Sequence, residues 1–206
     1  MFNRKEQIKQ LKTTSKFDIV VIGGGASGLG IAVDAASRGF KVALFEAHDF
    51  AKGTSSRSTK LVHGGVRYLA QGNIKLVIEA LRERGLLEKN ANHLFKRQTF
   101  LIPSYKWWFK YYYGFGLTIY DWLSARLSLG GSRIISAKKA SQKIKNLIPK
   151  GLNGAVTYLD GQFDDARLAL NLAQTAIEQG AVALNHFRVS DILKDLGLEY
   201  DVNNQV

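Results

Sequence analysis

The feature that most constrains this chain is a glycine-rich segment, residues 17–46, that joins two apolar runs. The first run, Ile19–Ile22, is short and does not alternate with polar residues, which predicts a strand buried on both faces of a parallel sheet. Gly23, Gly25 and Gly28 follow at the spacing G-x-G-x-x-G. The first glycine allows a tight turn, the second leaves room for a pyrophosphate, and the third lets a helix pack against the strand.

A helix and a second strand complete this pattern. A helix is expected over residues 26–38, because small residues line the side that would face the sheet and Gly39 can end it. The N–H groups and the positive dipole end at the start of this helix favour a phosphate. The second strand, 41–45, ends at Glu46, 18 residues after Gly28, where a carboxylate accepts hydrogen bonds from ribose hydroxyls. The segment therefore predicts a dinucleotide-binding βαβ unit, with NAD and FAD both open.

The length and composition narrow the class of protein. With 206 residues and 46% apolar content, the chain can build the core of one or two domains. It has no cysteine, which excludes disulfides, thiolate metal sites and a cysteine nucleophile. Residues 1–16 are polar and of mixed charge, which predicts a loose polar tail and not a secretory signal. No run of 18 apolar residues exists, so no membrane-spanning helix is expected.

The net charge of +12 is concentrated in one region. Residues 89–159 carry twelve Lys or Arg and a single acid, Asp121, and residues 100–122 hold eleven of the chain's 22 aromatic residues. Aromatic rings with a cationic rim are typical of a segment that lies in the headgroup layer of a membrane, and basic residues add attraction to anionic lipid. We therefore interpret 100–150 as an aromatic and basic insertion at a membrane surface. The alternative is that the rings pack on the rest of the protein. No nucleic-acid module accompanies them, so no nucleic acid is expected.

The sequence after residue 72 also predicts helices and strands to which no chemical role is assigned. An amphipathic helix is expected over 73–89, and a strand over 151–159. A helix over 164–179 begins with two aspartates, which are favourable near a positive dipole end, and a strand follows over 181–187.

A stretch rich in hydroxyl groups, TSSRSTKLVHGGVRYL, begins at Thr54. By itself it is typical of a solvated loop. After a dinucleotide fingerprint, its hydroxyls and amides can hold the pyrophosphate and ribityl chain of a longer cofactor.

Together with GGGASGLGIAVDAASRG and the FDDARL of residues 163–168, this stretch resembles the N-terminal part of the FAD-dependent glycerol-3-phosphate dehydrogenase family. The resemblance covers residues 17–190. It implies an α/β fold, a Rossmann-like FAD-binding domain with a parallel sheet, in the superfamily that also contains amino-acid oxidases. The cofactor that it implies is FAD, and no metal is expected.

The resemblance also implies roles for individual residues. Arg67 would bind the phosphate of glycerol 3-phosphate through a charge-assisted bond, with Tyr68 beside the substrate. His63 is a candidate catalytic base on residue type alone, since imidazole titrates near neutral pH. The residues implied to hold FAD are Gly23, Gly25, Ala26, Ser27, Gly28, Glu46, Thr54, Ser55, Ser56, Lys60 and His63.

The implied reaction is the oxidation of sn-glycerol 3-phosphate to dihydroxyacetone phosphate in glycerol metabolism. Hydride passes to FAD and electrons to a membrane quinone, in an enzyme that is cytoplasmic and peripheral on the inner face of the cell membrane. Because chains of this family continue well beyond position 206, we expect an N-terminal fragment with an incomplete sheet, which binds FAD poorly and turns over little.

Alternatives stay open. One is another FAD-dependent oxidoreductase of the amino-acid-oxidase-like superfamily, acting on an amino acid or hydroxy acid. Another is a non-catalytic fragment that binds a cofactor or a membrane. An NAD enzyme is the weakest option, because residues 54–68 have no natural role in one.

Overall fold

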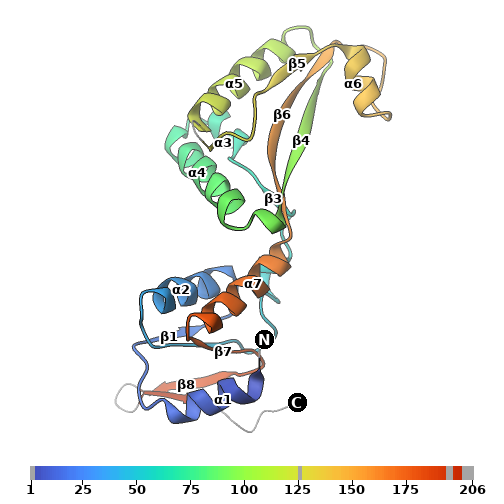
Figure 1. Cartoon of the computed structure of the whole chain (residues 1–206). Coiled ribbons are helices and arrows are strands. Elements are labelled where there is room, and N and C mark those ends of the chain that lie inside the picture. The colour runs from blue at the N-terminus through green and yellow to red at the C-terminus, as the bar shows by residue number, and fades with distance from the viewer. Residues whose placement is uncertain (1–2, 125–126, 194–196, 201–206) are drawn as a thin grey trace. The chain divides into compact units, whose positions relative to one another are not determined.

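The chain divides into two compact units, which Figure 1 shows in a computed structural model. The first unit comprises Met1–Thr59 and Asp164–Val206, and the second comprises Lys60–Phe163. The residues that the structure describes are 3–124, 127–193 and 197–200.

The first unit is built on a parallel sheet of order β1-β2-β7. Its strands are β1 (Ile19–Ile22), β2 (Val42–Phe45) and β7 (Val182–Leu184). Helix α2 (Ala26–Ser37) connects β1 to β2, which pair in register from Ile19 with Val42. The βαβ unit and its parallel sheet, predicted from the glycine segment, are therefore confirmed.

Helices α2 and α7 (Asp165–Glu178) pack together on one face of this sheet. Small side chains make the close approach possible: Ala32 and Ala176 are fully buried, and Leu29 fills the space beside them. Burial of this apolar surface is the main term that stabilises the layer.

Helix α1 (Arg4–Thr13) covers the opposite face, so the expectation of a loose tail at 1–16 is wrong. Leu11 is buried against β2 and β7. The Gln7 side chain accepts a hydrogen bond from the N–H of Ala183 at 2.9 Å, and Arg4 donates to the carbonyl of Asn185 at 2.7 Å. These polar residues satisfy backbone groups at the edge of β7, which is why a polar sequence folds here.

Strand β1 is buried on one face only, contrary to the prediction. Val20 is 37% exposed and Ile22 is 55% exposed, whereas Val21 is buried under α2. The reason is that α1 packs on β7 and β2 and leaves these two side chains of β1 partly uncovered. The first unit also contains a short 3-10 turn, η1 (Thr54–Ser56), and a hairpin of β8 (Val189–Leu193) with β9 (Gly197–Tyr200).

The second unit is an antiparallel sheet with helices. Its strands are β3 (Leu61–Val62), β4 (Phe95–Ser104), β5 (Arg133–Ile135) and β6 (Gly154–Phe163), and its helices are α3 (Val66–Ala70), α4 (Ile74–Asn90), α5 (Phe109–Ser124) and α6 (Ala137–Lys143), with a 3-10 turn, η2 (Asn92–Leu94). Strand β6 pairs along one edge with β4, and along the other with β3 and β5. The strand predicted at 151–159 is thus later and longer.

Helix α4 confirms the predicted helix over 73–89, although its buried face differs. Val77 and Leu81 are buried as expected, but Ile74 and Ile78 are exposed. Arg84 extends the buried face instead and is only 2% exposed.

The aromatic and basic stretch 100–150 supplies part of β4, α5, β5 and α6 to the second unit. Phe100 stacks on Tyr158 inside the unit, and Tyr120 is fully buried, so these two rings belong to the scaffold. Most of the other rings are exposed. In the part of the chain that the structure describes, no helix is long and apolar enough to cross a membrane.

Candidate functional site

The glycine turn between β1 and α2 has the geometry that its spacing predicts. Gly23 has a backbone φ of +113°, a value that residues other than glycine rarely adopt. Its N–H donates a hydrogen bond to the carbonyl of Phe45 at 2.8 Å. A Cβ atom at Gly28 would overlap the carbonyl oxygen of Gly23. The third glycine is therefore required for the helix to start this close to the strand.

The start of α2 presents backbone donors. Within the described residues, the N–H groups of Gly25, Ser27 and Gly28 have no hydrogen-bond partner, as is usual for the first turn of a helix. The N–H of Ala26 donates to the hydroxyl of Ser55 at 2.9 Å. Ala26 and Ser27 are exposed. Unpaired N–H groups and the helix dipole together suit an anion such as a pyrophosphate.

Glu46 lies at the end of β2, beside this turn. One carboxylate oxygen accepts a hydrogen bond from the N–H of Gly24 at 2.7 Å, and the other accepts from the N–H of His48 at 2.8 Å. Each oxygen can accept a second hydrogen bond. The carboxylate is thus held in place by the backbone while keeping acceptor capacity for a hydroxyl group.

The hydroxyl-rich loop is anchored inside the first unit. Thr54, Ser55 and Ser56 form η1, with Ser55 next to the start of α2. The carboxylate of Asp165 accepts hydrogen bonds from the N–H and the hydroxyl of Ser58, at 3.0 and 2.7 Å. This anchor could not be predicted from the sequence, because an aspartate at the start of a helix is typical of a cap.

Comparison with known proteins matches residues 18–205 to the family described as FAD dependent oxidoreductase. The chain belongs to this family. The turn residues fit the cofactor: the amides at the start of α2 are unpaired donors, Ser55 offers a hydroxyl, and Glu46 offers acceptor oxygens.

Individual proteins are also similar to this chain. The mitochondrial glycerol-3-phosphate dehydrogenase of Bos taurus is 46% identical over 199 residues, which are 93% of this chain and 27% of the relative. That of Schizosaccharomyces pombe is 43% identical over 93% of this chain and 31% of the relative. The glycerol-3-phosphate dehydrogenase of Bacillus halodurans, solved in complex with FAD, matches with 33% identity and a TM-score of 0.69, over 95% of this chain and 32% of the other. The chain thus spans about a quarter to a third of the length of these relatives.

Four of the predicted site residues lie in the second unit, at or near the turn between β3 and α3. Lys60 has a φ of +62°, and its carbonyl accepts from the N–H of Phe163. His63 is exposed. Tyr68 is 41% exposed, and its ring lies against Gly65. The backbone of Arg67 is in α3, whereas its side chain lies outside the described part of the structure.

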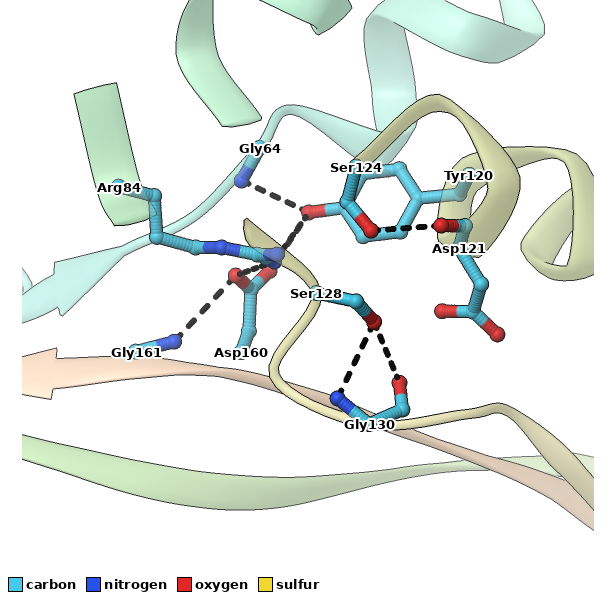
Figure 2. A network of polar contacts seen from close by, with 9 residues as sticks. All are labelled: Gly64, Arg84, Tyr120, Asp121, Ser124, Ser128, Gly130, Asp160 and Gly161. Atoms are coloured by element: carbon cyan, nitrogen blue, oxygen red, sulfur yellow. Dashed lines mark hydrogen bonds and ion pairs between the residues drawn. The ribbon is translucent and has the colours of Figure 1, made fainter. Parts of the chain in front are cut away.

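Beneath the same turn lies a buried polar cluster that was not predicted from the sequence (Figure 2). The Arg84 guanidinium and the Asp160 carboxylate, each 2% exposed, form an ion pair at 2.9 Å. The Tyr120 hydroxyl donates to Asp160 at 3.1 Å. Burial, together with the charge of Asp160, raises the pKa of Tyr120 well above its usual range. A signal existed in the sequence, because Arg84 occupies the helical face set by Val77 and Leu81.

No group of three or more His, Asp or Glu residues that could hold a metal ion is found among residues 3–124, 127–193 and 197–200.

Proposed function

We propose that the first unit binds FAD and that the protein oxidises sn-glycerol 3-phosphate to dihydroxyacetone phosphate. The observation that carries the proposal is the turn from Gly23 to Gly28, with its unpaired amides, in a chain 46% identical to a glycerol-3-phosphate dehydrogenase. The alternative is an enzyme of the same family that acts on an amino acid or hydroxy acid.

In this proposal the residues of the first unit hold the cofactor. The N–H groups of Gly25, Ser27 and Gly28 donate to the pyrophosphate, helped by the dipole of α2. The Ser55 hydroxyl, which now accepts from Ala26, lies close enough to the same helix start to join them. Glu46 accepts hydrogen bonds from the ribose hydroxyls, because its oxygens keep free lone pairs.

The substrate roles are assigned to residues of the second unit. Arg67 binds the phosphate of glycerol 3-phosphate, because a guanidinium matches the geometry of phosphate oxygens and stays charged at all relevant pH values. Tyr68 lies one residue on in α3. His63 is the candidate that removes the hydroxyl proton of the substrate. Lys60 and His63 are also assigned to the binding of FAD. FAD, when bound, supplies the hydride acceptor, and the protein contributes binding and orientation.

FAD titration of the purified 206-residue chain tests the cofactor part. We expect weak but saturable quenching of flavin fluorescence, with competition by ADP because it shares the adenosine and phosphate groups. Absence of saturable FAD binding by a folded chain would remove the cofactor proposal. If FAD binds, anaerobic bleaching of its visible absorbance by glycerol 3-phosphate, but not by amino acids or hydroxy acids, supports the substrate. Bleaching by those compounds instead would favour the alternative.

An exposed aromatic face along α5 and the residue before it supports a membrane surface as partner. We define this face as Trp108, Tyr111, Tyr112, Phe115 and Trp122, which recur at helical spacing and are between 44% and 79% exposed. The opposite side of α5 is buried through Leu117 and Tyr120. Two lysines lie beside these rings. Lys110 lies over the ring of Tyr111, which belongs to the face, and Lys106 lies over the ring of the neighbouring Phe109.

Large exposed rings with a cationic rim suit the headgroup layer, where a helix lies in the plane of the membrane. The seven cations between Arg126 and Lys150 add attraction to anionic lipid. We therefore propose that the protein is peripheral on the inner, cytoplasmic face of the cell membrane. There it passes electrons to a membrane quinone.

Vesicle co-sedimentation tests the aromatic face. The double variant Phe115→Ser and Trp122→Ser should bind vesicles of phosphatidylcholine and phosphatidylglycerol about tenfold more weakly than the unchanged chain. Phe40→Ser, which removes a 48% exposed ring from the first unit, is the matched control and should bind normally. Equal binding by all three chains would contradict a membrane role. Loss of self-association in the double variant without vesicles would instead indicate a second copy as the partner.

A further inference from the structure

The turn between β3 and α3 rests directly on the hydroxyl of Tyr120. The N–H of Gly64 donates to this hydroxyl at 2.8 Å, and both groups are buried. A Cβ atom at Gly64 would overlap the Tyr120 hydroxyl and the side chain of Leu81. Gly65, with a φ of +72°, then starts α3. The backbone is thus seated against α4 and α5 with no side chain between them.

The direction of the Tyr120 hydroxyl is determined by its three partners (Figure 2). The N–H of Gly64 and the guanidinium of Arg84, the latter at 3.3 Å, can only donate. The Asp160 carboxylate, at 3.1 Å, can only accept. The hydroxyl proton therefore points to Asp160, and both lone pairs are used by Gly64 and Arg84. All the hydrogen-bonding capacity of the hydroxyl is satisfied, which favours a single orientation of the turn.

The Arg84–Asp160 ion pair supports Tyr120 from below. Its charged groups are 2.9 Å apart, and Asp160 also accepts from the N–H of Gly161 at 3.3 Å. The Arg84 guanidinium lies 5.6 Å from the centre of the Tyr120 ring. A buried pair of this kind contributes little to stability relative to an apolar core, so its value lies in specifying a geometry.

We propose that Tyr120 is a positioning residue, which sets the place of His63 and of helix α3 through its hydrogen bond with the N–H of Gly64. This inference rests on the proposed function, in which Arg67 and Tyr68 of α3 contact glycerol 3-phosphate. Few bonds separate Tyr120 from these residues. Gly64 is next to His63 in the chain, and the carbonyl of Gly65 accepts a hydrogen bond from the N–H of Tyr68 at 2.8 Å. A shift of the turn therefore shifts the first turn of α3.

The variant Tyr120→Phe tests this inference, because it removes the hydroxyl and keeps the ring. We expect amide hydrogen exchange of residues 63–66 to become about tenfold faster, since a buried N–H loses its acceptor. Affinity for glycerol 3-phosphate, measured by calorimetry, should fall about tenfold, and by more than the affinity for FAD, because most of the proposed FAD contacts lie in the first unit. Tyr158→Phe is the matched control, because its ring contacts Tyr120 but no hydrogen bond of its hydroxyl is found in the described part of the chain.

The outcomes separate the inference from the proposed function. Unchanged exchange in Tyr120→Phe overturns the inference, as does faster exchange with unchanged affinity for glycerol 3-phosphate. If the unchanged chain does not bind this substrate at all, the proposed function fails, and with it the positioning role. Amide hydrogen exchange of the unchanged chain is a second test that needs no variant. The inference requires the N–H of Gly64 to be among the slowest to exchange between residues 60 and 70. Rapid exchange there overturns the inference even if the variant does not fold.

Discussion

The carboxylate of Asp165 accepts two hydrogen bonds from Ser58, one from its N–H at 3.0 Å and one from its hydroxyl at 2.7 Å. Asp165 is 4% exposed, so these bonds are shielded from water. Ser58 follows the η1 turn, which carries Ser55 to the start of α2. The aspartate thus ties the hydroxyl-rich loop to α7 and helps to set where the predicted cofactor ligands stand.

Replacement of Asp165 by Asn should weaken this anchor. Its amide group would face N–H or hydroxyl donors in place of one carboxylate oxygen. We expect the free energy of unfolding to fall by about 1–3 kcal/mol in urea titrations. Asp164→Asn is the control, because Asp164 caps α7 through the N–H of Arg167 at 2.9 Å, and asparagine caps helices equally well. Equal losses in the two variants would show that Asp165 is only a helix cap.

Two glycines of α2 should respond oppositely to alanine. Gly28→Ala would force a methyl group onto the carbonyl oxygen of Gly23, so we expect a loss of roughly 1–3 kcal/mol or more in unfolding free energy. Gly30→Ala meets nothing within 4 Å and should stabilise the helix by up to about 1 kcal/mol. Thermal and urea denaturation of the two variants measure whether each substitution lowers or raises the free energy of unfolding. A stable Gly28→Ala chain would argue against the close approach of α2 to β1.

Glu46→Gln should lower affinity for FAD about tenfold, because the amide group can no longer accept hydrogen bonds at one of the two oxygen positions. The backbone donors of Gly24 and His48 then compete with the ribose for a single acceptor oxygen. Asp34→Asn, in an exposed ion pair with Arg38 on α2, removes the same charge elsewhere and should bind FAD normally. Matching affinities for the two variants would exclude Glu46 from the cofactor site.

The raised pKa of Tyr120 predicts a loss of stability in alkali. Below about pH 10 the tyrosine is protonated in both the folded and the unfolded chain, so its full contribution is present. Above that pH the unfolded chain ionises at Tyr120 while the folded chain does not, because burial and Asp160 disfavour the phenolate. The free energy of unfolding then falls by about 1.4 kcal/mol per pH unit from this residue.

Urea titrations at several pH values from 8 to 11 (a range chosen around the usual tyrosine pKa of about 10) measure this slope. Tyr120→Phe should remove it, so the difference in stability between the unchanged chain and the variant shrinks above pH 10. Tyr111→Phe, which removes a 56% exposed hydroxyl, should leave the slope as it is. Parallel curves for the unchanged chain and Tyr120→Phe would contradict the shift.

Much of the first unit could be predicted because its signals are local. Gly23 and Gly28 meet steric demands set by neighbours in the chain, and the helix and strand periods are visible over ten to twenty residues. Local patterns gave a wrong prediction for residues 1–16, which were expected to form a loose tail but contain helix α1. The polar side chains of α1 find their partners at β7, far along the chain, and no local pattern reveals them.

The βαβ unit, the glycine turn and the family could all be predicted from the order of residues, because each depends on short spacings of residues with distinct chemistry. Which polar groups contact one another is set by the folding of the whole chain. Arg84 reaches Asp160 across 76 positions, and Ser58 reaches Asp165 across 107. Such pairs form because a buried charge or hydroxyl must be satisfied by whatever the fold brings beside it, and that choice is made by packing and not by sequence order.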